Sequence, residues 1–129
     1  NQAINTTITV SFNTEVFDVG NCFTGNNTFT APTTGKYVLG CNIRLEELDT
    51  AATRYYSFII TSNRNYLIDI IDPNFTTDLE HYNMGGTVVA DMAAGDTAIV
   101  TLYQQGGTAQ TDIYGTNSPQ TRFFGYLLG

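Results

Sequence analysis

The stretch "TRFFGYLLG", residues 121–129, gathers large apolar and aromatic side chains around one glycine. Successive side chains of a β-strand point to opposite faces, so Phe124 and Tyr126 share one face. Phe123 and Gly125 share the other. A strand that is apolar on both faces is an aggregation hazard when water reaches it. The stretch therefore predicts a strand that is covered on both sides.

Two further runs are apolar on both faces in the same way. In "RYYSFIIT", residues 54–61, Tyr55 and Ile59 alternate with Tyr56 and Phe58. The run "DTAIVTLY", residues 96–103, shows the same double pattern. A two-sheet sandwich needs one apolar face per strand, because the other face meets water. We therefore expect a second subunit to cover the extra face in a closed homo-oligomer.

Short β-branched and aromatic runs separated by Gly, Asn, Asp or Pro occupy most of the sequence. They are residues 4–12, 15–18, 28–31, 36–45, 54–61, 66–71, 86–92, 97–103 and 122–128. This spacing predicts about ten strands in an all-β sandwich or barrel. The segment 46–56 is the one helical candidate, and its Asp-Thr pair favours a turn. No linker or repeat divides residues 1–129, so we expect a single domain.

Composition excludes several classes of partner. Five Lys and Arg face twelve Asp and Glu, which gives a net charge of −7. Phosphate binding needs clustered basic residues, so nucleic acid is not an expected partner. No run approaches the roughly 18 apolar residues of a membrane span, and membrane insertion is not expected. The two cysteines leave two readings open: Cys41 as a buried core residue, or a disulfide to Cys22.

Several motifs, in order, resemble one family. The stretch "FTAPTTGKYVL", residues 29–39, resembles an aromatic strand, a proline turn and a glycine before a core strand. "GGTVVADMAAGDTAIVTL", residues 85–102, resembles paired glycines, a strand and a Gly-Asp hairpin turn. "TRFFGYLL" resembles the closing strand, and "VFDVGNCFTGNNTF" extends the match upstream. The chain resembles the globular head of the complement q component, whose jelly roll is shared with tumour necrosis factor.

The resemblance implies a two-sheet jelly roll that assembles as a homotrimer around a three-fold axis. Carried over by motif, Phe123 falls where the relatives place an axis-facing aromatic, beside the closing glycine Gly125, and both residues are expected at the trimer interface. Tyr82 and Met84, just before the paired glycines, fall near another trimer interface position. Heads of this kind sit on stalks, so the resemblance also implies the C-terminal part of a longer stalked protein.

The absence of Trp and the abundance of Asn, Thr and Gly favour a phage tail fibre or tail-needle knob over an animal complement head. The expected function is a non-enzymatic trimeric head that recognises a cell-surface receptor or glycan, at an extracellular site or on the virion surface. Two alternatives stay open. One is a trimerisation and capping module without a ligand, and the other is a secreted lectin-like head of a cellular organism.

Residue chemistry offers little catalysis. His81 is the only histidine, and no nucleophile elbow accompanies it, so we expect no enzyme. No Cys and His set has zinc spacing, and no cofactor is expected. Calcium stays open, because hard cations bind clustered oxygens and acidic side chains gather between residues 69 and 80. The candidate ligands are Asp69, Asp72, Asp78 and Glu80.

Binding residues collect on polar loops that a rigid scaffold holds apart. The loops 61–66, 72–83 and 104–120 are rich in polar residues. In the first, Arg64 with Asn63 and Asn65 could grip a carboxylate or sugar hydroxyls. In the last, Tyr114 could stack on a sugar ring. These four residues are the predicted ligand-binding set.

Overall fold

The structure, a computed structural model, describes residues 1–13, 18, 20–115 and 120–129. These residues form ten strands and no helix, and the strands make two sheets. The strands are β1 (Thr7–Thr9), β2 (Phe23–Thr24), β3 (Thr28–Thr30), β4 (Gly35–Glu46), β5 (Ala52–Thr61), β6 (Asn65–Ile71), β7 (Tyr82–Met92), β8 (Thr97–Gly106), β9 (Asp112–Ile113) and β10 (Arg122–Leu127). The predicted all-β sandwich is confirmed.

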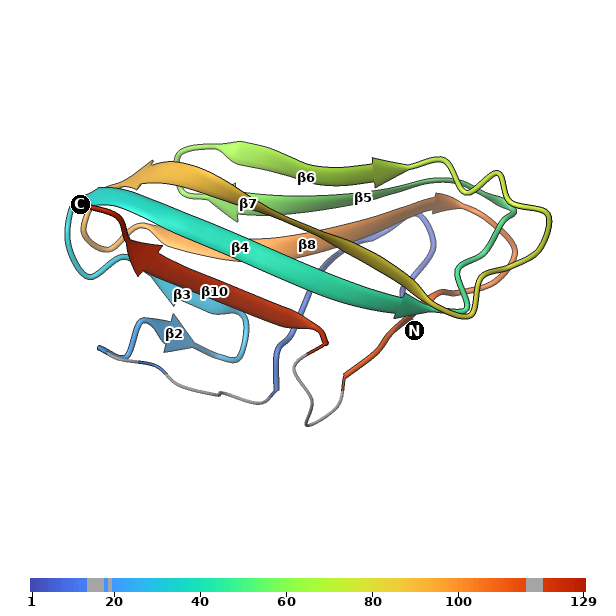
Figure 1. Cartoon of the computed structure of the whole chain (residues 1–129), viewed down its shortest axis with the longest axis horizontal. Helices are drawn as coiled ribbons and strands as arrows, with labels where there is room; N and C mark the ends of the chain where they lie inside the picture. The colour runs from blue at the N-terminus through green and yellow to red at the C-terminus, as the bar shows by residue number, and fades with distance from the viewer. Residues whose placement is uncertain (14–17, 19, 116–119) are drawn as a thin grey trace.

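The larger sheet has six strands in the order β2-β3-β8-β5-β6, and β1 also pairs with β8. The smaller sheet has the order β10-β4-β7, and β9 pairs with β4. All pairs between these strands are antiparallel. Figure 1 shows β4 and β10 crossing in front of β8, so the two sheets form two layers. Neighbours such as β4 and β7 are far apart in sequence, which is typical of a jelly roll rather than a meander.

The core fills the space between the sheets. On β4 the alternate residues Tyr37, Leu39 and Ile43 are buried, as the period of two predicts. On β5 the buried residues Tyr55 and Ile59 face them from the other sheet. Burying one such side chain stabilises the fold by about 1.5–3 kcal/mol. This shared interior holds the two sheets together.

Two glycines act as the motifs predict. Gly95 has a φ of 89°, in the left-handed region that favours glycine, and lies in the β7–β8 turn. The carboxylate of the next residue, Asp96, accepts a hydrogen bond from the amide of Ala93 at 2.8 Å. A Cβ on Gly125 would lie 2.8 Å from Leu39 and 3.0 Å from Phe29. Gly125 therefore lets the core side chains approach the closing strand.

Sequence patterns located most strands but not their bounds. β7 begins at Tyr82, four positions before the expected start, and the two-residue strands β2 and β9 were not expected. The segment 46–56 contains a turn and the start of β5 rather than a helix. The expected run 15–18 lies mostly outside the described residues. Both cysteine thiols are free, so Cys22 and Cys41 are not bridged.

A buried polar network closes one end of the sandwich. The carboxylate of Asp49, which is 2% exposed, accepts hydrogen bonds from the amides of Ala51, Thr108 and Ala109 at 2.6–2.8 Å. Burial alone raises the pKa of Asp49, but the three amide hydrogen bonds outweigh it and hold the pKa below its usual value. The network therefore fastens the turn before β5 to the loop after β8.

Candidate functional site

The outward surface of β10, β4 and β7 is apolar at one end, and we call this surface the β4 face. Tyr126, Val38 and Val89 are paired in register across the three strands. Tyr126 is 54% exposed and Val89 is 55% exposed. The ring of Phe124 stacks beside Tyr126 with centroids 6.5 Å apart. An exposed cluster of this kind on adjacent strands is typical of an interaction surface.

The other end of the β4 face is polar and is organised by Arg44. Its Nη2 lies 3.1 Å from Oε1 of Glu46 and 3.1 Å from Nδ1 of His81. The guanidinium stands 4.2 Å above the ring centre of Tyr114, a cation–π contact, and donates a hydrogen bond to Oε1 of Gln120. Arg44 is thus held from several sides, and its side chain is 21% exposed.

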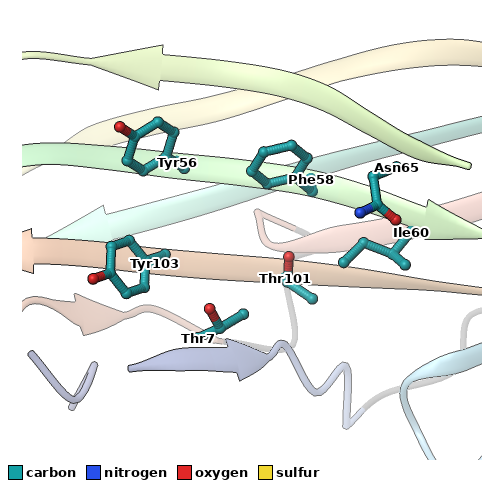
Figure 2. Close-up of a pocket in the computed structure, with 7 residues that line it drawn as sticks. All are labelled: Thr7, Tyr56, Phe58, Ile60, Asn65, Thr101 and Tyr103. Atoms are coloured by element: carbon teal, nitrogen blue, oxygen red, sulfur yellow. The ribbon is translucent and has the colours of Figure 1, made fainter. Parts of the chain in front are cut away.

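The outward surface of the larger sheet, the β5 face, carries a hollow. The aromatic side chains of Tyr56, Phe58 and Tyr103 line it, and its volume is about 360 Å³. Figure 2 shows these rings on one side of the sheet, with Thr7 and Thr101 between or below them. Tyr56 and Phe58 are nearly parallel, with an interplanar angle of 22°. The second apolar set that the sequence predicted for β5 and β8 therefore surrounds a hollow.

Comparison with solved structures finds the same architecture. The globular domain of zebrafish complement 1qA protein matches with a TM-score of 0.62 and 15% identity, over 99% of this chain and 92% of that chain. The Eiger TNF of S. frugiperda matches with a TM-score of 0.51 and 13% identity, over 92% and 82%. The chain has the complement and tumour necrosis factor jelly-roll fold. No protein-family model matches the sequence, and no curated protein does.

Three of the four residues predicted at the trimer interface point into the jelly roll. Met84 is fully buried in the core, and Gly125 faces Leu39. The ring of Phe123 packs against Phe12 and Phe23 with centroids 5.7 and 5.3 Å away. The outward neighbours Phe124 and Tyr126 are the aromatic side chains of β10 that are exposed.

Tyr82, the fourth of these residues, is half-buried, and its ring lies 6.5 Å from that of Phe75. It stands near the polar end of β4, where Tyr82 pairs with Leu45. A single protomer does not test contact with another copy. The assignment of the interface to these four residues stays a prediction.

The predicted ligand-binding set does not form one site. Asn63 and Arg64 lie in the β5–β6 hairpin, at the left end in Figure 1. There Asn63 donates hydrogen bonds to Asp96 and to the carbonyl of Asp91, and Arg64 forms a 3.9 Å ion pair with Asp91. Tyr114 instead stacks under Arg44, near the opposite end of β4. These residues belong to separate surfaces of the jelly roll.

Asn65 is the exception, because it stands at the edge of the hollow on the β5 face. Figure 2 shows its side chain above Ile60, which also lines the hollow. Sequence reasoning assigned Asn65 to a loop, but it is the first residue of β6. Its contribution to binding stays a prediction.

The four calcium candidates are dispersed. Asp72 forms an ion pair with Arg54 at 2.9 Å, and Asp78 accepts two hydrogen bonds from Thr50 at 2.8 Å. Asp69 accepts from the amide of Ile70, while Glu80 is exposed. Within the described residues, no group of three His, Cys, Asp or Glu could hold a metal ion. Within one copy, the described part of the chain does not gather these carboxylates into one oxygen cage, and calcium binding stays a prediction.

His81 belongs to the polar end of the β4 face. Its Nδ1 lies 3.5 Å from Oε1 of Glu46, and its side chain is exposed. Neither serine nor cysteine shares these contacts, so the described arrangement does not resemble a nucleophile with its base. No helix in the described part of the chain is long and apolar enough to cross a membrane.

No sequence pattern predicted the hollow. Alternation on residues 54–61 and 96–103 indicated an apolar outward set, but that set could equally have been flat. The hollow exists because Thr101 and Thr7 are small and lie beside three large rings. That arrangement depends on the pairing of β5 and β1 with β8.

Proposed function

We propose that the chain is a non-enzymatic head domain that forms a homotrimer at the tip of a phage tail fibre and recognises a receptor or glycan on the cell surface. The observation that carries the proposal is the β4 face. Its apolar end would contact water in a single copy, although it lies in a jelly roll that resembles heads built of three copies. In a homotrimer, other copies of the same chain would cover this surface, so no different protein is needed.

The magnitude supports assembly through this face. Burying one large aromatic side chain stabilises an interface by about 2–3 kcal/mol. Each copy offers Phe124 and Tyr126, with Val89 and Leu128 beside them. Three copies multiply that contribution, whereas one isolated protomer leaves all these side chains in water. The polar end of the face then forms the rim, which is the usual arrangement of a stable interface.

Composition supports the placement on a virion. The chain has no Trp and twelve Gly, and its net charge of −7 keeps an extracellular head soluble. Loops and sheet surfaces outside the β4 face stay available for a receptor. The same composition argues against a nucleic acid partner, because few basic residues are present to meet phosphate.

The mass of the purified domain in solution tests the assembly. Light scattering is expected to give three times 14.1 kDa, with and without EDTA. A stable monomer would remove the trimer from the proposal and leave the fold alone. A trimer that dissociates in EDTA would show that a metal holds the subunits together, against the dispersed carboxylates described above.

Recognition needs a separate experiment. Fluorescently labelled domain is expected to bind cells of the natural host and not cells stripped of surface polysaccharide and protein. Binding to neither, with the trimer intact, would favour the capping module without a ligand.

A further inference from the structure

The hollow of the β5 face joins aromatic surface to hydrogen-bonding groups. Tyr56 lies 6.4 Å from Phe58 and 6.1 Å from Tyr103, measured between ring centroids. The three side chains are half-buried, so part of each ring is open to solvent. Tyrosine and phenylalanine rings bury large apolar area, and the tyrosines also carry a hydroxyl. A ligand here meets apolar walls with a polar end.

Hydroxyl and amide groups stand around the rings. Thr101 forms the floor of the hollow and is 4% exposed, and Thr7 on β1 pairs with Tyr103. Asn65 adds an amide at the edge of the hollow. In Figure 2 the phenol oxygens of Tyr56 and Tyr103 lie at the same end, opposite Asn65. The hollow therefore offers donors and acceptors at both ends of an apolar centre.

Charge narrows the class of ligand. None of the described residues that line the hollow carries a charge at neutral pH. Arg54, on the same strand as Phe58, also contacts the side chain of Tyr56 at the end of the hollow, and its guanidinium is paired with Asp72 at 2.9 Å. The protein as a whole has a charge of −7, which repels anions at long range. An anionic ligand therefore finds only a positive charge that Asp72 already neutralises, and a cationic ligand finds no carboxylate among the lining residues.

A neutral molecule with flat apolar faces and hydroxyl groups along its edge matches these features. Sugar rings have this chemistry, because their C–H faces pack on aromatic rings while their hydroxyls form hydrogen bonds. The volume of about 360 Å³ lies within the range of small-molecule sites, which is roughly 300–1,000 Å³. We propose that the hollow on the β5 face binds a neutral saccharide, with the rings of Tyr56, Phe58 and Tyr103 as its packing surface.

This inference rests on the proposed function and names the site of its glycan recognition. The β4 face and the β5 face belong to different sheets and point away from the core in opposite directions. Assembly through the β4 face therefore leaves each hollow open. Three weak sites on one head then bind a repetitive surface polysaccharide more tightly than one site alone.

The test is titration of the trimer with neutral disaccharides, followed by NMR of the backbone amides. The probes are lactose, maltose, mannobiose and chitobiose, and sialyllactose is the anionic counterpart of lactose. At least one neutral probe is expected to shift the signals of Tyr56, Phe58 and Tyr103. Sialyllactose is expected to bind no more tightly than lactose, because Asp72 already neutralises Arg54, the cation beside Tyr56.

Substitutions then locate the site. Tyr103→Ala and Phe58→Ala are each expected to weaken binding of that probe about tenfold, because each removes a packing surface. Tyr103→Phe retains the ring and is expected to weaken binding less. Thr7→Val keeps the shape and removes one hydroxyl, so it reports on the hollow even if an alanine variant fails to fold. Phe75→Ala is the control, because it removes an exposed aromatic ring in the 72–81 loop that does not line the hollow. This variant is expected to bind the probe as tightly as the original protein does.

Four results overturn the inference. They are no shift of these signals by any neutral probe, tighter binding of sialyllactose than of lactose, an unchanged saccharide affinity in Tyr103→Ala, and a six-copy mass of the original protein that falls to three copies in Tyr103→Ala. The last result would show that a second head occupies the hollow.

The cell-binding assay separates this inference from the proposed function. Cell binding of unchanged strength in Tyr103→Ala refutes this site and leaves the proposed function standing. No cell binding by the original protein refutes the proposed function itself.

Discussion

The two outward faces of the jelly roll are both apolar, but they differ in shape. On the β4 face the ring of Phe124 lies over Gly40, where a Cβ would come within 2.3 Å of that ring. A glycine under an aromatic ring lets the ring lie close to the sheet. On the β5 face Thr101 lies among three rings that surround a hollow. Exposed rings that lie close to a sheet suit contact with another protein, and a hollow suits a small molecule.

The comparison teaches that an apolar second face has more than one use. The strands that sequence analysis grouped together as doubly apolar fall into two sets, residues 122–128 on one sheet and residues 54–61 and 96–103 on the other. The proposed homotrimer interface would account for the first set. The second set needs its own explanation, and the neutral saccharide is the one that its polar groups favour.

The largest expected effect separates the two faces. Phe124→Asp is expected to convert the trimer to a folded monomer, because three carboxylates at an apolar interface cost several kcal/mol each. The mass measured by light scattering should fall to 14.1 kDa, while the circular dichroism spectrum should remain that of a β-sheet protein. The hollow on the β5 face should keep its shape, so saccharide affinity per site should be unchanged.

Phe123→Asp is the matched control on the same strand. Its ring packs on Phe12 and Phe23, so a carboxylate there is expected to unfold the protomer rather than separate the subunits. The opposite pattern would be a folded monomer from Phe123→Asp and an intact trimer from Phe124→Asp. That result would show that Phe123, the residue that the sequence motif indicated, lies at the interface.

Asp49→Asn belongs to neither face and is expected to lower the free energy of unfolding by about 1–3 kcal/mol, because the asparagine amide cannot accept all three backbone hydrogen bonds. The measurement is urea denaturation. Without urea, folded Asp49→Asn is expected to have the mass of three copies, as the original protein does.

The pH dependence of the same site has a defined sign. The pKa of Asp49 is held below its usual value in the folded protein. Its contribution is therefore present above the pKa of the unfolded chain, near 4, and is lost as the pH falls through the folded value. Asp49→Asn should remove that part of the acid sensitivity. An identical acid profile in both proteins would assign the loss of stability to other carboxylates.

A smaller effect is expected from Gly40→Ala. The added methyl group meets the end of the Phe124 ring, which must move away from the sheet. We expect assembly to weaken by about 1–3 kcal/mol, the usual range for an overpacked contact, while saccharide binding stays unchanged. Dilution series in analytical ultracentrifugation would measure the change. If the original protein and Gly40→Ala dissociate at the same concentration, the position of the Phe124 ring close to the sheet is not needed for assembly.

The smallest effect is a difference in thiol labelling. Burial raises the pKa of Cys41 to about 11, and burial followed by Asp18 raises that of Cys22. Cys41 lies within β4, while Cys22 precedes β2 of the larger sheet and is half-buried. At pH 8 we expect Cys22 to react first with Ellman's reagent and Cys41 to react on unfolding. Simultaneous reaction would show that both sheets open together.

Sequence reasoning was most successful where a local rule applies. The Gly-Asp turn needs a positive φ at Gly95 and a short acceptor at Asp96, and both requirements are met. The alternation of Tyr55 with Tyr56 separates a buried side chain from a half-exposed one, as expected. The fold class followed from the spacing of such runs together with the family motifs.

The site was harder, because each candidate depended on distant partners. Asn63 and Tyr114 are both polar loop residues, yet they lie near opposite ends of the sandwich. The four acidic residues between 69 and 80 are close in sequence, but Arg54 and Thr50 engage two of them separately. Residues that are close along the chain were therefore expected to share a site, but the strand pairing places them apart.

By itself the sequence determined which side chains share a face of a strand, because side chains alternate between the two faces with a period of two. It placed Phe124 with Tyr126 and Phe123 with Gly125, and it required that both sets be covered. Only the tertiary structure decided which set faces inward. Phe123 pairs with Cys41 of β4, whose side of the sheet meets the other layer, and Phe124 pairs with Gly40 on the outside. That choice depends on which side of the sheet the second layer covers, and alternation within one strand carries no information about that layer.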